Sequence, residues 1–359
     1  MIKIQASVSK GWLHQAGSFT FDSQYYLNPL FRLERDREIN KFLREKFPNY
    51  ALYNMEDNLV QAEFYNENLV QVGAIQPNMI IAVMLGAKFS FFADKDSDVT
   101  GYPLKDIKDA FELPPVDKLL NHQFIKDLTK EVVKIQKSRP DLTVIPPFFW
   151  DLSGRATIHG IITTSLKLVG ENIITLLLVN PQLAHSINQW IADVYIAIIK
   201  YFSKLANLPV TSVHIGECSG TMLSRELYEE FIVPYISTLG DKLGKIRLHS
   251  CGKSDYLIES FAKIRNLGVI DTGSGTSVKK IREILGNNIE INVFPAVEIL
   301  MKGSSKEKVK EWLYRILEEN NNGPLKIAYH LENEYDINNC LFIHEELYRL
   351  GLITQSRNY

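Results

Sequence analysis

The feature that most constrains the fold is a regular alternation of strand-like and helix-like segments that begins near Asp141. Short β-branched and aromatic runs predict strands at Thr143–Phe148, Thr211–Ile215, Ile246–Ser250, Leu267–Asp271, Ile289–Phe294 and Leu325–His330. Longer amphipathic runs between and after them predict helices at Gly154–Gly170, His185–Phe202, Ser224–Leu239, Asp255–Arg265, Val278–Leu285, Ser305–Asn320 and Asn338–Leu350. Alternation at this spacing indicates a parallel sheet covered by helices.

The number of strand–helix units decides between two architectures. Six units lie from Thr143 onward, and one or two more from the first part would complete the eight of a (β/α)8 TIM barrel. An open doubly wound sheet is the alternative, but no Gly-x-Gly-x-x-Gly follows a predicted strand. Ile173–Leu178 stays ambiguous: its residue types favour a strand, whereas its continuation through Asn180-Pro181 favours a helix pair. We therefore expect an α/β fold of the barrel type.

The first part of the chain is expected to be less regular. Aromatic residues lead into a charged helical pattern, RLERDREINKFLREKF, which ends before Pro48. An apolar helix at Met79–Leu85 and a strand at Lys88–Ala93 follow. We expect residues 1–359 to form a single barrel domain, in which about 1–85 provide an irregular, partly helical N-terminal extension and the early elements.

Composition excludes several classes of protein. The formal net charge of the 359 residues is -2, so no basic excess indicates a nucleic-acid partner. The N-terminus lacks the apolar core of a signal peptide, and the Ile173–Val179 run is too short to span a membrane. Three cysteines are too few for a disulfide framework. We expect a cytoplasmic protein, not bound to a membrane, whose thiols are free for metal binding or catalysis.

Polar residues gather where the predicted strands end, and in a barrel these ends meet at one mouth. His249 and Cys251 are two apart, so they point to the same side of an extended backbone. A histidine, a cysteine and a third ligand from a neighbouring strand end describe a catalytic zinc site. His330 is the first choice for that third ligand, and Glu332 and Cys340 are the alternatives.

Two carboxylates at strand ends are candidates for a catalytic role. Glu217 could orient a ligand or act as a general base, or it could only pair with a nearby cation. Asp271 begins a glycine-rich turn whose amides could receive an anion at a helix N-terminus, or the segment is simply a tight turn. Cys218 follows Glu217 directly, so along a strand it faces the other way unless a turn swings it in.

These motifs together resemble a known family. Gly216-Glu-Cys-Ser-Gly-Thr-Met-Leu-Ser224, the Tyr228–Tyr235 segment and His249-Ser-Cys251-Gly252 are similar to the uroporphyrinogen decarboxylase superfamily, and more narrowly to its cobamide-dependent zinc methyltransferases. The resemblance covers about Thr143 to Leu350, and His-x-Cys-Gly is its most specific part. It implies a (β/α)8 barrel and zinc bound by His249 and Cys251. The family's third ligand, a cysteine near the last strand, is missing here; His330 or Glu332 stands in that neighbourhood.

The resemblance also implies a reaction and its partners. Zinc would activate an acceptor thiol, which attacks the methyl group of a methylated corrinoid (a methylcobamide) carried by a partner protein. A decarboxylase of a carboxylated tetrapyrrole or a smaller acid is the runner-up, although the arginines of that branch are absent from the Trp12–Ser18 segment. A barrel that binds a corrinoid or tetrapyrrole without turnover is the third possibility. Methyl donor and acceptor have no sequence signature.

Overall fold

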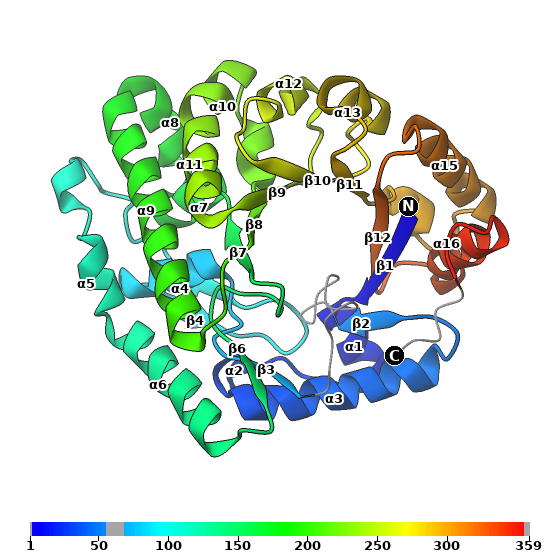
Figure 1. The fold of residues 1–359 in the computed structure, drawn as a ribbon, viewed down its shortest axis with the longest axis horizontal. Helices are drawn as coiled ribbons and strands as arrows, with labels where there is room; N and C mark the ends of the chain where they lie inside the picture. The colour runs from blue at the N-terminus through cyan, green and yellow to red at the C-terminus, as the bar shows by residue number, and fades with distance from the viewer. Residues whose placement is uncertain (1, 55–67, 355–359) are drawn as a thin grey trace.

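A curled parallel sheet forms the centre of the molecule (Figure 1). The computed structural model describes residues 2–54 and 68–354. Eight strands are ordered β2-β1-β12-β11-β10-β9-β8-β7, and each pair of neighbours runs parallel. Their bounds are β1 Ile2–Val8, β2 Leu52–Asn54, β7 Arg155–His159, β8 Ser212–Gly216, β9 Lys245–Ser250, β10 Leu267–Thr272, β11 Glu290–Val293 and β12 Leu325–Leu331. The expected α/β class with a parallel sheet is confirmed.

Two further strand pairs lie outside this sheet. β3 (Leu69–Gln71) pairs in parallel with β6 (Thr143–Ile145), and Figure 1 shows this pair on the side of the ring between β7 and β2. β4 (Lys88–Ser90) and β5 (Asp98–Thr100) form an antiparallel pair. The strand predicted from Thr143 therefore exists, but in the smaller sheet.

Helices cover the outer side of the curl, where Figure 1 shows α9, α11, α13, α15 and α16. The larger helices are α1 Lys10–Gly17, α3 Pro29–Lys46, α4 Pro77–Met84, α6 Gln123–Ser138, α7 Ile161–Val169, α8 Asn172–Val179, α9 Pro181–Ala206, α10 Arg225–Phe231, α11 Val233–Leu243, α13 Val278–Leu285, α15 Lys306–Glu319 and α16 Ile337–Arg349. Short ones are α2 Ser23–Leu27, α5 Val116–Leu120, α12 Ile258–Phe261, α14 Val297–Leu300 and the 3-10 helices η3 Ala110–Glu112, η4 Cys218–Met222 and η5 Asp255–Leu257.

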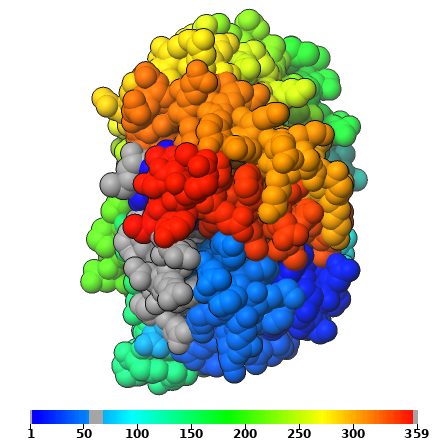
Figure 2. Space-filling model, turned by 90° about the vertical axis from the view of Figure 1, so that its right-hand side faces the viewer, coloured from blue at the N-terminus to red at the C-terminus, as the bar shows by residue number. Residues whose placement is uncertain are grey.

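The start of the chain differs from the expected irregular extension. Residues from Ile2 onward form β1, which pairs with β12 on one side and with β2 on the other. The helix α16 returns to this region (Figure 2), where the Tyr50 hydroxyl donates to Glu345 at 2.9 Å. The first residues are therefore part of the main sheet. The single-domain prediction stays a prediction, and residues 55–67 of its early segment lie outside the described residues.

The Gly154–Gly170 segment, predicted as one helix, is a strand followed by a helix. In β7 the apolar Ala156 and Ile158 alternate with the polar Arg155, Thr157 and His159, whose side chains line the inner cavity. This two-residue period is that of a strand. The ambiguous Ile173–Leu178 run lies in the helix α8. Apolar side chains thus pack between sheet and helices, where each buried Ile or Leu contributes roughly 1.5–3 kcal/mol, and polar side chains face the centre of the curl.

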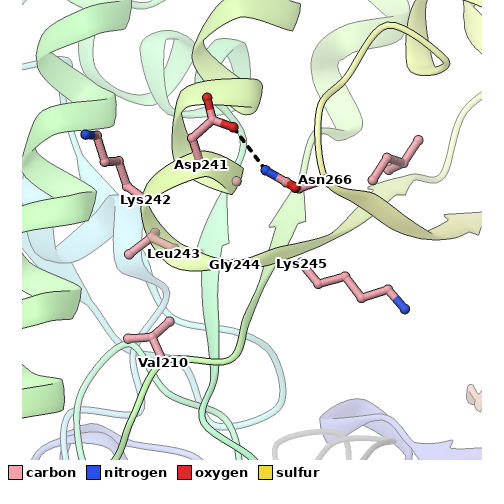
Figure 3. Close-up of a pocket in the computed structure, with 9 residues that line it drawn as sticks. Val210, Asp241, Lys242, Leu243, Gly244, Lys245 and Asn266 are labelled. Atoms are coloured by element: carbon pink, nitrogen blue, oxygen red, sulfur yellow. Dashed lines mark hydrogen bonds between the residues drawn. The ribbon is translucent and has the colours of Figure 1, made fainter.

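Two properties of the outer surface complete the fold. Among the described residues, no single helix has the length and apolar character needed to cross a membrane. The helices α7 and α8, which are bent by 111° relative to each other, reach that length and apolar character only when they are counted together. A hollow opens at the amino-terminal ends of β8 to β10 (Figure 3), where Asn266 donates to Asp241 at 3.0 Å. This hollow lies at the amino-terminal ends of the strands, whereas His249 and Asp271 lie toward their carboxyl-terminal ends.

Candidate metal centre and cavity

The carboxyl-terminal ends of three neighbouring strands bring the candidate residues together. Strand register places Gly216 of β8 beside His249 of β9, and His249 beside Asp271 of β10. Cys251 lies just beyond the end of β9, and Cys218 begins the 3-10 turn η4 after β8. In parallel α/β folds these strand ends carry the catalytic residues. Pairing of β8, β9 and β10 therefore brings His249, Asp271 and the segments that carry Cys218 and Cys251 to the same edge of the sheet.

Three potential metal ligands form one compact group. Cys218, His249 and Cys251 each offer a donor atom, and these atoms all lie within 4.8 Å of one another. Cys251 is exposed, whereas Cys218 and His249 are partly buried. The predicted pair His249 and Cys251 is thus present, and the third member is Cys218.

The charges in this group favour a thiolate at Cys251. A hydrogen bond from Cys218, together with one from His249, lowers the pKa of Cys251 to about 4. The same contact and burial raise the pKa of Cys218 far above its usual range, so Cys218 is the thiol that donates. Thiolates are the form of cysteine that binds metals.

His249 is oriented from behind by a carboxylate. Its Nδ1 lies 3.0 Å from Asp271 Oδ1, and Arg247 Nη2 donates to Asp271 Oδ2 at 2.7 Å. Burial opposes protonation of His249, but the charge of Asp271 outweighs it and raises the pKa of His249 to about 10. A carboxylate beside one ring nitrogen leaves the other for a metal, as in carboxylate–histidine–zinc arrangements. Asp271 therefore fits an orienting role in this site.

A cavity of about 350 Å³ extends from this group into the curl of the sheet. Cys218, His249 and Asp271 line it, together with inward-facing side chains of the other strands and three aromatic residues after β6: Arg155, Thr157, His159, His214, Arg247, His330, Phe148, Phe149 and Trp150. Its size is at the lower end of the roughly 300–1,000 Å³ that small-molecule sites occupy. The site can therefore hold a small ligand beside the three donor atoms.

The cavity wall presents polar atoms that remain available. Among the residues that the structure describes, Arg155 Nε, Thr157 Oγ1 and His214 Nδ1 are buried and have no hydrogen-bond partner. Burial lowers the pKa of His214 well below its usual value, so its imidazole is neutral. An unsatisfied buried polar group costs about 1–3 kcal/mol, which a polar ligand would recover.

The three residues considered from the sequence as third ligand lie apart from the group. His330 lines the cavity, but its Nδ1 is hydrogen-bonded to Ser7 of β1, and the Phe294 ring contacts both its imidazole and that of His249. Glu332 is partly buried, and Cys340 is buried within α16. In the described part of the chain none of their donor atoms joins the cluster. The geometry therefore favours Cys218 over His330.

Glu217, a candidate catalytic residue in the sequence, faces away from the cavity. It is fully buried, and its Oε1 accepts hydrogen bonds from the Thr163 amide and hydroxyl, both at 3.1 Å. Burial raises the pKa of Glu217 to about 7. Its carboxylate thus lies at the N-terminus of α7 and not in the lining of the cavity. The turn that places it there also swings Cys218 inward, and the Cys-Ser-Gly sequence after Glu217 was the only sign of that turn.

The donor set fits zinc. Two cysteine sulfurs and one histidine nitrogen match the ligand set of catalytic zinc sites, which use three protein ligands and keep one position open. Soft thiolate ligands favour zinc over magnesium or calcium. Asp271 supplies the supporting carboxylate that such histidines require.

Comparison with known proteins agrees with the fold. Over 97% of this chain and 94% of the other, the structure is similar to a methyltransferase from Methanosarcina mazei, with a TM-score of 0.61 and 14% identity. It also matches a B12-independent methionine synthase from Shewanella sp. W3-18-1, in complex with selenomethionine, with a TM-score of 0.48, 9% identity and 98% coverage of both chains. A search of curated proteins finds no match. The sequence profile of uroporphyrinogen decarboxylase (URO-D) matches residues 77–328, well over half of the chain. The chain therefore belongs to the uroporphyrinogen decarboxylase family.

Proposed function

We propose that this protein is a zinc-dependent methyltransferase that moves a methyl group between a corrinoid, carried by a partner protein, and a thiol or similar acceptor. The observation that carries the proposal is the gathering of Cys218, His249 and Cys251 at the end of a cavity. Family membership and the fold shared with a methyltransferase support it. The closed (β/α)8 barrel expected from the sequence belongs to the same proposal, since the curled parallel sheet is consistent with it.

Cys218, His249 and Cys251 would hold the metal, and His249 would use the ring nitrogen that does not face Asp271. When bound, zinc supplies Lewis acidity that lowers the pKa of an acceptor thiol. Asp271 keeps the imidazole in one orientation, and Arg247 keeps Asp271 in place. The residues of the chain thus prepare a site in which a thiolate can form at neutral pH.

The cavity would bind the acceptor. Its free donors, Arg155 Nε and Thr157 Oγ1, suit a ligand whose non-reacting end carries oxygen atoms. Phe148 and Phe294 supply aromatic walls that exclude water from the reacting end. Because Cys251 is exposed, the group is open to solvent at this residue, where the corrinoid of a partner protein could approach.

Methyl transfer from methylcobalamin to a panel of small thiols tests this function. We expect turnover by the zinc-loaded protein and its loss in Cys251→Ser. Cys340→Ser is the matched control, because Cys340 is buried in α16 outside the group. Turnover that survives both chelation of zinc and Cys251→Ser would contradict the proposal. Binding of corrinoid with no transfer to any thiol would instead favour a non-catalytic binding protein.

One observation favours decarboxylation as a second candidate. Two guanidinium groups, those of Arg155 and Arg247, line the cavity, and arginines at this position could bind substrate carboxylates. The volume of about 350 Å³ suits a small acid better than a tetrapyrrole. Both cations already face carboxylates, since Arg155 Nη2 lies 3.5 Å from Asp151 and Arg247 bonds Asp271. Release of CO₂ from a small acid by metal-free protein would support this candidate over the methyltransferase.

A further inference from the structure

We infer that Glu217 and Thr163 form a clamp that positions Cys218 as the third metal ligand. The clamp consists of the Glu217 carboxylate, the Thr163 amide and hydroxyl, and the Ser219 amide. It joins the start of α7 to the turn η4. This inference rests on the proposed metal site and assigns its positioning residues.

The need for a clamp follows from where the three ligands come from. His249 and Cys251 belong to the same strand end, so the backbone of β9 fixes them relative to each other. Cys218 comes from η4, a 3-10 turn after β8. A short 3-10 segment has poor hydrogen-bond geometry of its own and depends on outside contacts. The position of Cys218 therefore depends on contacts that lie outside its own turn.

Residues on both sides of Cys218 are held from outside the turn. On one side, Glu217 Oε1 accepts from Thr163 N and Oγ1 at 3.1 Å each, and the Glu217 amide donates to the His249 carbonyl at 2.8 Å. On the other side, the Ser219 amide donates to Thr163 Oγ1 at 3.2 Å. Thr163 thus bonds both neighbours of Cys218, and β9 bonds one of them.

A helix N-terminus offsets part of the cost of burying the Glu217 carboxylate. α7 begins after Gly160, which offers no side chain to cap the first amides. The buried Glu217 carboxylate faces the amides of Ile161, Ile162 and Thr163 instead. A carboxylate is stabilised at this end of a helix by the free amides and by the helix dipole.

Two glycines pack closely against the Glu217 side chain. A Cβ added to Gly160 would lie 2.3 Å from Glu217 Cδ and Oε2, so any larger residue there would push the carboxylate out of this position. A Cβ at Gly220 would lie 2.7 Å from the Tyr228 ring and 3.2 Å from Glu217 Cγ. Gly160 before α7 and Gly220 within η4 thus both leave space that the Glu217 side chain occupies.

The clamp is tested by two isosteric substitutions in α7. Thr163→Val removes the hydroxyl that bonds Glu217 and Ser219, while the backbone amide remains. Thr164→Val is the matched control, since its buried hydroxyl bonds Tyr195 at 2.8 Å in the same helix turn and does not contact the cluster. Affinity for Co²⁺ and the intensity of thiolate-to-cobalt charge-transfer absorption are measured for both variants and for wild type.

We expect Thr163→Val to bind Co²⁺ about 10–100-fold more weakly, as loss of supporting contacts does in other metal sites. Its charge-transfer intensity should fall toward that of Cys218→Ser, whereas Thr164→Val should match wild type. Glu217→Gln should retain the wild-type spectrum, because an amide oxygen still accepts from Thr163, and Glu217→Ala should not. A purely structural role would lower stability in both threonine variants without changing the spectrum.

Two failures are distinguishable. Two-thiolate binding of equal affinity in wild type and Thr163→Val would overturn the clamp and leave the metal site standing. Absence of Co²⁺ binding in wild type, or a wild-type spectrum identical to that of Cys218→Ser, would overturn the metal site that the clamp serves.

Discussion

Asp271→Asn is the substitution that most sharply tests the electrostatics of the site. Asp271 is buried, and its two oxygens face Arg247 Nη2 at 2.7 Å and His249 Nδ1 at 3.0 Å. Burial raises the pKa of Asp271, but the charges of His249 and Arg247 outweigh it and hold the pKa well below its usual range. Asparagine keeps the shape of the side chain and removes only its charge.

The expected magnitude follows from the pair that is broken. Removing one partner of a buried ion pair costs about 3–5 kcal/mol, because the other charge stays buried without compensation. The side chain of Arg247 is only 10% exposed, so water cannot replace Asp271. Asparagine still offers one acceptor oxygen, which places the expected loss near 3 kcal/mol. Zinc affinity should fall in parallel by about 10–100-fold, because His249 loses its supporting carboxylate.

The assay is denaturant unfolding of the metal-free protein, followed by circular dichroism and by tryptophan fluorescence. Asp241→Asn is the matched control. Asp241 also pairs with an arginine, Arg265 at 2.5 Å, but on the exposed surface at the other end of the strands (Figure 3), where solvent screens the pair. The free energy of unfolding should fall much more for Asp271→Asn. Equally small losses in the two variants would refute the reasoning.

Three further predictions concern the ligands and the cavity. The lowered pKa of Cys251, about 4, keeps its thiolate formed above that pH, so iodoacetamide should modify Cys251 of the metal-free protein at nearly constant rate between about pH 6 and pH 8. A thiol with the usual pKa of 9.0 would instead react about tenfold faster per pH unit, and mass spectrometry of the Cys251 peptide distinguishes the two. His330→Gln and Cys340→Ser should retain full zinc content by elemental analysis, and loss of zinc in either would restore that residue as a ligand. Thr157→Val should raise the KM for the acceptor while zinc content stays unchanged; an unaltered KM would place the acceptor elsewhere.

The sequence predicted those parts of the site that depend on local structure. His249 and Cys251 are two apart on one strand, so their common direction follows from strand geometry. The alternation of strands and helices from β8 to α16 followed equally from hydrophobic periodicity. The spacing of His249 and Cys251 and the hydrophobic periodicity are both properties of neighbouring residues in the chain, so they can be read from the sequence.

The third member of the cluster, Cys218, could not be predicted because its position depends on contacts between distant segments. Cys218 points inward because it lies in a turn. The residues on either side of it, Glu217 and Ser219, are hydrogen-bonded to Thr163, which lies more than fifty residues earlier in the chain. His330 lies at a strand end beside the cavity, as predicted, and its Nδ1 is hydrogen-bonded to Ser7. Ser7 lies in β1, a strand that the sequence interpretation had missed.

The strand β7 was hidden in the sequence by its polar side chains. β7 alternates buried apolar residues with Arg155, Thr157 and His159, and the inner face of this sheet is polar rather than filled with branched apolar side chains. Strands of a barrel with an apolar interior show near-continuous hydrophobic runs, which are easier to identify. The polar inner face that hid β7 is the same feature that provides the cavity with the free donors Arg155 Nε and Thr157 Oγ1.

X-ray absorption at the zinc edge tests the central claim most directly, namely that Cys218, His249 and Cys251 form one metal site. We expect two sulfur ligands and one histidine nitrogen in the wild-type protein, and one sulfur ligand in Cys218→Ser. A wild-type site with a single sulfur, or a two-sulfur site that persists in Cys218→Ser, would contradict it.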